Sequence, residues 1–205
     1  FAKANYSTFK AGEITCVSAL EQTSGRGRQD RKWLSPPGNL YATFYLQLPQ
    51  NTPHFVGIGL LLAFSLCQVL QKENLFAQIK WPNDVLLNGK KICGILCETI
   101  MQNTNFAVFL GIGINLNTPV VTEKGAICLQ EATRQQWAIK KFLTQLQEQF
   151  EKDLPLFRQK GLTPFLDEIE RRLAYKNQKI LCQSAQKKYL GIVHSLSSEG
   201  FLNLF

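Results

Sequence analysis

The pattern of apolar and polar positions changes once along the 205-residue chain. Up to about residue 115, short runs rich in β-branched and aromatic residues alternate with turn residues, which predicts strands. These runs are residues 14–19, 40–48, 85–87, 90–98 and 106–115. Farther along, apolar side chains recur at helical spacing, at Ile139, Phe142, Leu143, Leu146 and Phe150. We predict an amphipathic helix there, which Pro155 ends or kinks.

One apolar stretch in the first half indicates a buried helix. No Lys, Arg, Asp or Glu occurs between Trp33 and Gln71. The densest part, residues 56–70, is shorter than the roughly 20 residues that a membrane-spanning helix needs. It also contains Ser65 and Gln68, and it lies too far along the chain to be a signal peptide. We therefore predict a helix in the protein core and no membrane association.

The C-terminal end returns to a strand pattern after a short helix that opens at Thr163-Pro164. Strands are expected at residues 179–182, 188–194 and 201–205, with a turn at 197–200. A segment of under thirty residues is too short to bury a core of its own. We expect a main domain of residues 1–176 and a small β module, residues 177–205, that leans on it.

Composition narrows the possible functions. An apolar fraction of 45% with 11% aromatic residues is typical of a globular protein. The net charge of +8 would attract nucleic acid, an acidic membrane or an acidic protein. The Lys and Arg residues are scattered, however, and form no arginine-rich run, which argues against nucleic acid. The six cysteines make no CxxC pair, which disfavours zinc and suggests buried thiols in a reducing cytoplasm.

A loop near residue 30 concentrates positive charge among glycines. Residues 24–33 read Ser-Gly-Arg-Gly-Arg-Gln-Asp-Arg-Lys-Trp. Glycines allow backbone amides to approach an anion, and each arginine can hold a carboxylate or phosphate with two hydrogen bonds. The segment is therefore either an anion-binding loop or simply a solvated basic loop.

A second group of polar residues precedes a predicted hairpin. The motif Lys80-Trp81-Pro82-Asn83-Asp84 leads into a strand that turns at Asn88-Gly89, a pair typical of a type I′ turn. The resulting register pairs Asp84 with Cys93 and places Asp84, Lys91 and Cys93 on one face. Asp84 and Lys91 are then diagonal neighbours, roughly 7–8 Å apart at the backbone. A lysine and an aspartate on one face suit phosphates and magnesium, although Lys91 could also simply reach solvent.

The third group is Gly111-Ile112-Gly113-Ile114-Asn115. On a strand, Gly111, Gly113 and Asn115 share one face, which leaves a flat floor with an amide at its end. Glycine weakens a strand and is often tolerated because another group approaches closely. We expect such a group above this floor.

Together these segments resemble the motifs of biotin–protein ligases, in the family's order. Residues 24–33 are similar to the GRGRxxRxW loop and residues 80–84 to the KWPND motif. Residues 91–98, Lys-Ile-Cys-Gly-Ile-Leu-Cys-Glu, are similar to the K-x-x-G-I-L-x-E strand, and residues 111–115 to the GxGxN strand. The resemblance covers nearly the whole chain.

The resemblance implies an α+β fold. Its central mixed β-sheet is flanked by helices, as in class II aminoacyl-tRNA synthetases, and a small C-terminal SH3-like β module follows. It also implies an activity. ATP and Mg²⁺ convert biotin to biotinyl-5′-AMP, and the biotin then passes to a lysine of a biotin carboxyl carrier protein.

The resemblance assigns site residues by their position in the motifs. Biotin would contact Gln22, Gly25, Arg26, Gly27, Arg28, Tyr41, Lys91, Gly94 and Gly111. ATP would contact Arg28, Trp33, Asn83, Asp84, Lys91 and Asn115. The catalytic residues would be Lys91, Arg28 and Arg26, and Asp84 is the candidate magnesium ligand.

The sequence departs from the family pattern at several points. The family's Ser-Thr motif is expected upstream of residue 1, so part of the biotin pocket is missing from this chain. Asp30 stands where many members have glycine, and Ala126 stands where many have an aromatic residue that covers the adenine. No helix-turn-helix precedes the ligase motifs, so we expect the short form without a repressor role.

Two other functions remain as alternatives. A lipoate–protein ligase shares the fold and the adenylate chemistry, but its usual motifs differ from residues 24–33. A non-enzymatic nucleic-acid-binding protein could use residues 25–32 as a phosphate clamp. We expect a cytoplasmic ligase that binds neither DNA nor membranes and is a monomer or a weak homodimer.

Overall fold

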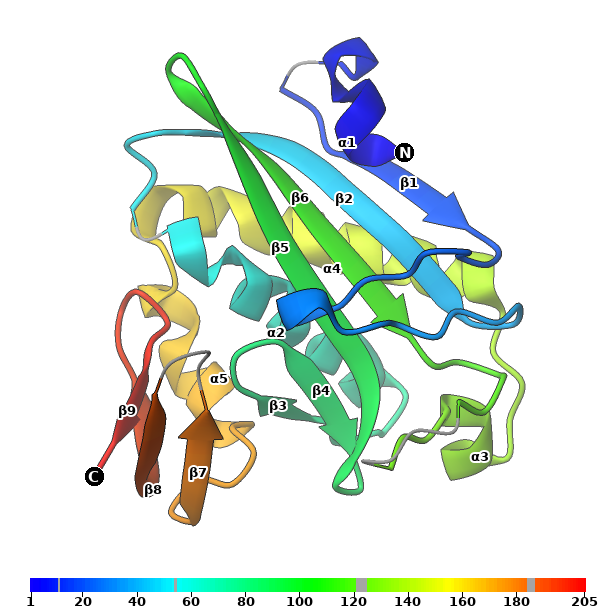
Figure 1. The fold of residues 1–205 in the computed structure, drawn as a ribbon, viewed down its shortest axis with the longest axis vertical. Helices are drawn as coiled ribbons and strands as arrows, with labels where there is room; N and C mark the ends of the chain where they lie inside the picture. Colours follow the sequence, from blue (N-terminus) through cyan, green and yellow to red (C-terminus); the bar gives the residue numbers. More distant parts are fainter. Residues whose placement is uncertain (11, 54, 121–124, 184–186) are drawn as a thin grey trace.

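The computed structural model describes residues 1–205 except 11, 54, 121–124 and 184–186 (Figure 1). A six-stranded sheet, in the order β1-β2-β6-β5-β4-β3, forms the centre of the molecule. Its strands are β1 (Thr15–Ala19), β2 (Leu40–Pro49), β3 (Gln78–Lys80), β4 (Asp84–Leu87), β5 (Lys90–Gln102) and β6 (Asn105–Ile114). Neighbouring strands are antiparallel. Parallel pairing occurs at two isolated bridges, Ile79–Leu173 and Lys91–Ala126. The predicted α+β class is confirmed.

Two long helices cover one face of this sheet and lie behind it in Figure 1. They are α2 (Ile58–Lys72), which follows η3 (Phe55–Gly57), and α4 (Ile139–Lys160). By length and composition, residues 55–72 could cross a membrane, yet most of that stretch is buried in the fold. The prediction of a core helix is therefore confirmed. Pro155 was predicted to end or kink this helix; it does not end it, because α4 continues to Lys160 with Leu154 and Phe157 buried on either side of the proline. A kink at Pro155 stays a prediction.

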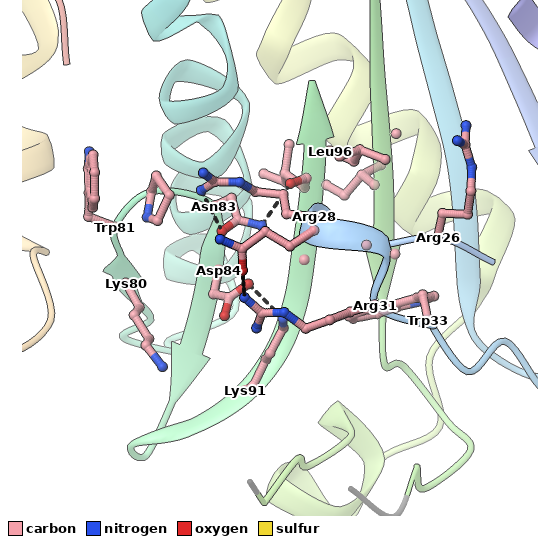
Figure 2. A pocket seen from close by; sticks show the side chains of 18 of the residues that line it. Arg26, Arg28, Arg31, Trp33, Lys80, Trp81, Asn83, Asp84, Lys91 and Leu96 are labelled. Atoms are coloured by element: carbon pink, nitrogen blue, oxygen red, sulfur yellow. Dashed lines mark hydrogen bonds and ion pairs between the residues drawn. The ribbon is translucent and has the colours of Figure 1, made fainter. Parts of the chain in front are cut away.

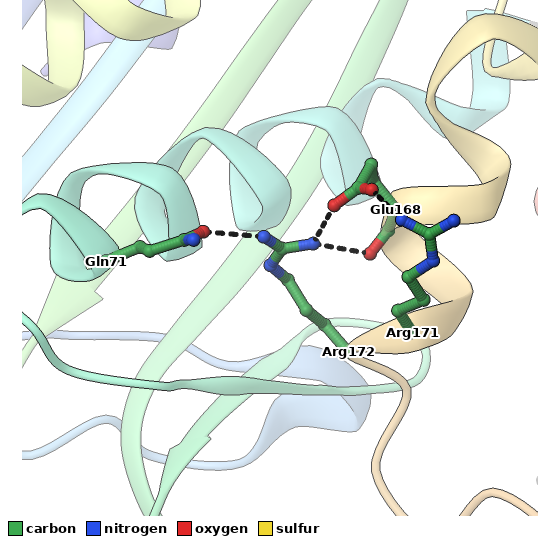
Figure 3. A network of polar contacts seen from close by, with 4 residues as sticks. All are labelled: Gln71, Glu168, Arg171 and Arg172. Carbon is green, nitrogen blue, oxygen red and sulfur yellow. Dashed lines mark hydrogen bonds and ion pairs between the residues drawn. The ribbon is translucent and has the colours of Figure 1, made fainter.

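The remaining elements are short, and the sequence pattern did not predict most of them. They are α1 (Ala2–Asn5), η1 (Tyr6–Thr8), η2 (Arg28–Asp30), α3 (Leu129–Thr133), η4 (Thr163–Phe165) and α5 (Leu166–Arg171). Of these, α5 is tied to α2 by the polar contacts of Arg172 (Figure 3). Its guanidinium donates to the Glu168 carboxylate at 2.6 Å and to Gln71 Oε1 at 2.6 Å. Thr163 does not cap its helix, since no side-chain cap hydrogen bond forms there.

The two faces of the central sheet have different roles because side chains alternate along each strand. The helix-covered face carries a continuous apolar layer that includes Phe44, Leu110 and Cys93. On the other face, one end is covered by a small cluster in which α1 packs against Tyr45 and Phe109. The rest of this second face is poor in large side chains, and we call it the open face. It is where the glycines of β5 and β6 lie.

The hairpin of β4 and β5 differs from the predicted register by a β-bulge. Leu86 pairs with Lys91, as predicted, and Asn88 and Gly89 have the positive φ angles of a type I′ turn. Val85, however, pairs with Cys93, so that Asp84 pairs with Gly94 instead of Cys93. The extra residue reverses the alternation, and Cys93 is buried in the core while Lys91 stays on the open face. The sequence pattern does not indicate this bulge, because Ile92 and Cys93 are both apolar and either could face the core.

The C-terminal strands form a separate three-stranded sheet, as expected. They are β7 (Lys179–Gln183), β8 (Lys188–Leu196) and β9 (Leu202–Leu204), all antiparallel. This sheet contacts the main domain through the Glu170 carboxylate, which accepts a hydrogen bond from the Leu196 amide at 2.8 Å. The boundary at residue 177 stays a prediction.

Asn39, at the start of β2, organises the segment that follows β6. Its Oδ1 accepts hydrogen bonds from three successive backbone amides, those of Leu116, Asn117 and Thr118, at 2.8–3.0 Å. Its Nδ2 donates to the Thr118 carbonyl at 2.9 Å, and the side chain is buried. Asn39 therefore fixes the chain that leaves the open face after Asn115.

Replacing Asn39 with alanine should destabilise the protein strongly. The Leu116 and Thr118 amides would lose their acceptor, whereas the Asn117 amide keeps a bond to the Gly38 carbonyl at 3.2 Å. At about 1–3 kcal/mol for each unpaired group, we expect a loss of at least about 2 kcal/mol. Urea denaturation of Asn39→Ala checks this. The exposed Asn203, whose Nδ2 donates to Ser195 Oγ, provides the control, and Asn203→Ala should cost less than about 0.5 kcal/mol. Equal losses in the two variants would contradict the role of Asn39.

Candidate functional site

A cleft of about 1590 Å³ lies on the open face, and most of the predicted site residues line it. Its walls come from the β1–β2 loop, the β3–β4 loop and the C-terminal sheet. The loop between β1 and β2 crosses in front of β5 and β6 in Figure 1. The predicted residues that line the cleft are Gln22, Arg26, Gly27, Arg28, Trp33, Asn83, Asp84, Lys91, Gly94, Gly111 and Asn115.

Two predicted residues, Gly25 and Tyr41, are not on the cleft wall. Gly25 is buried, and a Cβ there would lie 2.4 Å from the Trp33 carbonyl oxygen, so its role is to let the loop close. Tyr41 lies on the open face of β2, but its hydroxyl is buried and donates to the Pro36 carbonyl at 2.8 Å. Burial raises the pKa of this phenol above its ordinary value. Tyr41 therefore supports the loop from beneath.

The backbone of the basic loop, which spans residues 22–35, is held together by hydrogen bonds between its two arms. The Trp33 amide donates to the Gly25 carbonyl at 2.9 Å, and the Gly27 amide donates to the Arg31 carbonyl at 2.7 Å. The tip is the 3₁₀ turn η2, where Gln29 has a φ of 56°. At the base, Ser35 Oγ donates to Gln22 Oε1 at 2.7 Å. These contacts make residues 22–35 a narrow hairpin-like loop.

Trp33 lies on the glycine floor of the sheet. A Cβ on Gly113 would lie 2.4 Å from Trp33 Nε1, and a Cβ on Gly94 would lie 2.9 Å from Trp33 Cζ3. The indole therefore occupies the space that two missing side chains leave. This confirms the expectation that another group approaches the glycines, and it identifies that group as a side chain of the loop. Gly111 is open by comparison, with no contact closer than 3.6 Å to an added Cβ among the described atoms.

Lys91 is held from two sides. Its Nζ lies 2.6 Å from Asp84 Oδ1 and 5.1 Å from the centre of the Trp33 ring (Figure 2). A cation over an aromatic face is attracted by the ring quadrupole. Asp84 and Lys91 thus form a direct ion pair across the hairpin, on the open face of the sheet. Lys91 presents a fixed positive charge in the cleft.

Asn83 and Arg28 lie beside this pair. Asn83 Nδ2 donates to the Ile95 carbonyl at 3.0 Å, and the Ile95 amide donates to the Asn83 carbonyl at 2.8 Å. Arg28 Nη1 lies 3.5 Å from Asn83 Oδ1. Figure 2 shows Arg28 close to Asn83 and Asp84, whereas Arg26 points away from them. The loop therefore contributes Arg28 to the Lys91 end of the cleft.

Arg26 belongs to a different cluster, which the sequence did not reveal. Its Nη2 lies 3.5 Å from Glu98 Oε2, and Lys3 Nζ lies 2.9 Å from Glu98 Oε1. Glu98 ends the K-x-x-G-I-L-x-E motif, but nothing in the motif indicates that its carboxylate joins the N-terminal helix to the loop. Arg26 and Lys91 do not converge on one point in this structure.

Asn115 stands at the far end of the glycine floor. Its side chain is buried, and its Nδ2 donates to the Ile127 carbonyl at 3.4 Å. Its Oδ1 has no hydrogen-bond partner within the described part of the chain. Ala126 also lines the cleft here and forms the isolated bridge to Lys91. A buried acceptor beside a cleft that lacks a partner is a candidate for a ligand N–H group.

The electrostatics of the cleft favour anionic ligands. The described cations on its wall are Lys3, Arg26, Arg28, Arg31, Lys32, Lys80 and Lys91. The described carboxylates there are Asp84 and Glu98, both already paired with cations. The arrangement can therefore hold phosphates or carboxylates by charge-assisted hydrogen bonds.

Cys93, the cysteine next to Lys91 and Asp84 on β5, is unsuited to nucleophilic catalysis. Burial raises the pKa of its thiol well above its ordinary value, although Lys91 partly opposes this shift. Because the thiolate is the reactive form, this buried side chain is a poor nucleophile near neutral pH.

Alanine at Gly113 should displace Trp33, whereas alanine at Gly111 should not. The added methyl group would overlap the indole at position 113 but meet only ordinary contacts at position 111. The indole ¹⁵N–¹H signal of Trp33, assigned with a Trp33→Phe variant, reports the position of the ring. We expect it to shift strongly in Gly113→Ala and little in Gly111→Ala. An unchanged signal in Gly113→Ala would show that the ring does not rest on this glycine.

Comparisons with known proteins agree with this geometry. The model of the Biotin/lipoate A/B protein ligase family matches residues 3–115. A biotin–[acetyl-CoA-carboxylase] ligase of Paracoccus denitrificans is 31% identical over 198 residues, covering 92% of this chain and 82% of that protein. The bifunctional ligase/repressor BirA of Escherichia coli is 32% identical over 206 residues, or 95% of this chain, but this chain spans only 62% of that relative's length.

A solved structure extends the similarity to nearly the whole fold. The biotin protein ligase from Aquifex aeolicus in complex with biotin and ATP superposes with a TM-score of 0.84. It is 30% identical, and the match covers 96% of this chain and 83% of that chain. The family model matches more than half of the chain, and the sequence and structure comparisons cover nearly all of it. This chain therefore belongs to the Biotin/lipoate A/B protein ligase family.

Proposed function

We propose that this chain activates biotin with ATP to biotinyl-5′-AMP and transfers the biotin to a lysine of a carrier protein. The observation that carries the proposal is the convergence of four separate motifs on one cationic cleft around Lys91. Family membership includes both biotin and lipoate ligases, but the relatives with printed substrates act on biotin. Lipoate is therefore the alternative substrate that an experiment must exclude.

The first step joins two anions. An oxygen of the biotin carboxylate attacks the α-phosphorus of ATP, a new C–O–P bond forms, and the bond to the leaving pyrophosphate breaks. The barrier comes largely from charge repulsion and from orientation, so fixed cations supply the catalysis. We assign this role to Lys91, with Arg28 beside it. Arg26, which pairs with Glu98, is assigned to holding the biotin end of the loop.

The second step needs no enzyme nucleophile either. The neutral amine of the carrier lysine attacks the biotinyl carbonyl, an amide bond forms, and AMP leaves as the proton passes to solvent. This agrees with the raised pKa of the buried Cys93 thiol on β5. Charge neutralisation at the phosphate again favours departure of AMP.

Magnesium would enter with the nucleotide. Mg²⁺ is commonly held by one or two carboxylates together with substrate phosphates, and Asp84 is the carboxylate that faces the cleft near Lys91. No cluster of three metal-ligating side chains occurs among the described residues, so the phosphates would supply most of the ligands. The ion would neutralise phosphate charge when bound.

The nucleotide base would lie toward Asn115. The unpaired Oδ1 of Asn115 is a candidate acceptor for an exocyclic amino group, and Trp33 and Asn83 line the same cleft. Ala126 offers only a methyl group there, so adenine binding would depend more on the Asn115 amide than on ring stacking. The biotin would occupy the side of Gln22, Gly27, Gly94 and Gly111.

The remaining assignments extend the proposal to the cellular setting. By analogy with the Paracoccus relative, the acceptor would be the biotin carboxyl carrier subunit of acetyl-CoA carboxylase or a similar protein. We place the reaction in the cytoplasm because all six cysteines are free thiols, which suits a reducing compartment. We further propose a catalytic unit of residues 1–176, no DNA binding, and a monomer or weak homodimer.

Pyrophosphate release should require biotin, ATP and a divalent metal ion together. Adding a biotin carboxyl carrier domain should then give a biotinylated product, visible by streptavidin blotting, with no signal when the acceptor lysine is replaced by arginine. Equal activity with lipoate would overturn the assignment of biotin. Salt-sensitive binding to arbitrary duplex DNA without use of ATP would instead favour the nucleic-acid-binding alternative.

Lys91→Ala should lower single-turnover adenylate formation by about 100-fold or more, because it removes a preorganised cation from the position where charge develops. Lys90→Ala is the matched control. It removes a neighbouring, exposed lysine on the same strand that does not line the cleft. Thermal unfolding of both variants separates lost folding from lost chemistry. Similar adenylation rates in the two variants would remove Lys91 from the mechanism.

A further inference from the structure

One hydrogen bond joins the turn between β8 and β9 to a loop that carries site residues. Trp81, in the β3–β4 loop, donates from Nε1 to the Gly200 carbonyl at 2.8 Å. Gly200 is tightly enclosed in the main domain, since an added Cβ would lie 2.9 Å from side-chain atoms of Leu60 and Leu162. The acceptor is therefore held in place by the core, and the turn between β8 and β9 provides a fixed point for the indole.

The loop that carries Trp81 is short and carries site residues. Lys80 and Asp84 pair directly as the last residue of β3 and the first of β4. Only Trp81, Pro82 and Asn83 lie between them. The loop is anchored on one side by the reciprocal hydrogen bonds of Asn83 with Ile95 on β5. On its other side the anchor is Trp81 (Figure 2).

A second contact joins the same sheet to the main domain without touching the site. The Glu170 carboxylate on α5 accepts hydrogen bonds from the Leu196 amide at 2.8 Å and from Lys176 Nζ at 2.7 Å. Glu170 does not line the cleft, at least over the residues that the structure describes. The C-terminal sheet is thus attached by these two hydrogen-bonded contacts and by the packing of Leu196 and Leu202 on the core. Of the two hydrogen-bonded contacts, the one made by Trp81 reaches the loop that carries Asn83 and Asp84.

We propose that Trp81 is a positioning residue through which the C-terminal sheet sets the nucleotide end of the site. The contact with Gly200 holds the β3–β4 loop against β5, which places Asn83 beside Arg28 and brings Asp84 within 2.6 Å of Lys91. The chemical role of these residues rests on the proposed function. The mechanical coupling does not, because it concerns only how the loop is held.

The test compares Trp81→Phe with Glu170→Ala. Phenylalanine keeps an aromatic ring but removes the N–H donor, whereas Glu170→Ala releases the remote attachment. Loss of one neutral hydrogen bond that orders a ligand-binding loop typically changes an equilibrium about 3- to 10-fold. We expect Trp81→Phe to raise the KM for ATP by about that factor while leaving the KM for biotin within about twofold. Glu170→Ala should lower the thermal unfolding midpoint without changing either KM.

Amide hydrogen exchange supplies a readout that needs no activity. The Ile95 amide, which donates to the Asn83 carbonyl, should exchange several-fold faster in Trp81→Phe and at the parent rate in Glu170→Ala. If both variants, or neither, accelerate exchange at Ile95, the coupling through Trp81 is wrong. If exchange behaves as expected but the parent shows no biotin-dependent use of ATP, the proposed function fails and the coupling stands. A rise in both KM values in Trp81→Phe would overturn the specific link to the nucleotide end.

Discussion

The site depends on two sheet positions that are occupied by glycine and so leave space for another group. Gly94 and Gly113 lie next to each other on neighbouring strands, and the Trp33 indole fills the space above them. These glycines are required for space, because a methyl group at either position would overlap the ring. The seated ring fixes the end of the basic loop, whose Trp33 amide closes onto Gly25, and it gives Lys91 an aromatic face to lie over. The positions of the basic loop, of the sheet glycines beneath it and of Lys91 thus depend on one another.

The rest of the fold supplies what this arrangement needs. Helices α2 and α4 cover one face of the sheet, which leaves the other face to three segments that are far apart in sequence. The N-terminal helix covers one end, the basic loop crosses the middle, and the C-terminal sheet closes the remaining side. No single segment could form the cleft. Its charge pattern therefore exists only in the folded chain. Glu98 joins the N-terminal helix to the basic loop, and Trp81 joins the β3–β4 loop to the C-terminal sheet.

Much of this was predictable, and the failures have physical causes. Periodicity identified the main strands and the core helix, and motif order brought together nearly all residues that line the cleft. The bulge at Ile92 was hidden because two successive apolar residues fit either face. The roles of Asn39 and Glu98 were missed because each acts on partners distant in sequence, which no local pattern encodes. Tyr41 was assigned to the cavity, but only the structure shows its hydroxyl turned to the backbone of the loop.

The cations of the cleft divide into one fixed charge and several adaptable ones. Lys91 belongs to β5, pairs with Asp84 from β4 and lies over Trp33 from the loop, so three elements determine its position. Arg26, by contrast, is mostly exposed, and Arg28 makes one long contact with Asn83. A fixed charge stabilises a transition state without reorganising, whereas an exposed arginine must first be ordered by the ligand and spends part of its binding energy on that ordering. In the proposed reaction, the rate should therefore depend mainly on Lys91, and the retention of substrate and adenylate mainly on the arginines. The arginines of the basic loop and Lys91 are then not redundant sources of charge, because the arginines affect retention and Lys91 affects the rate.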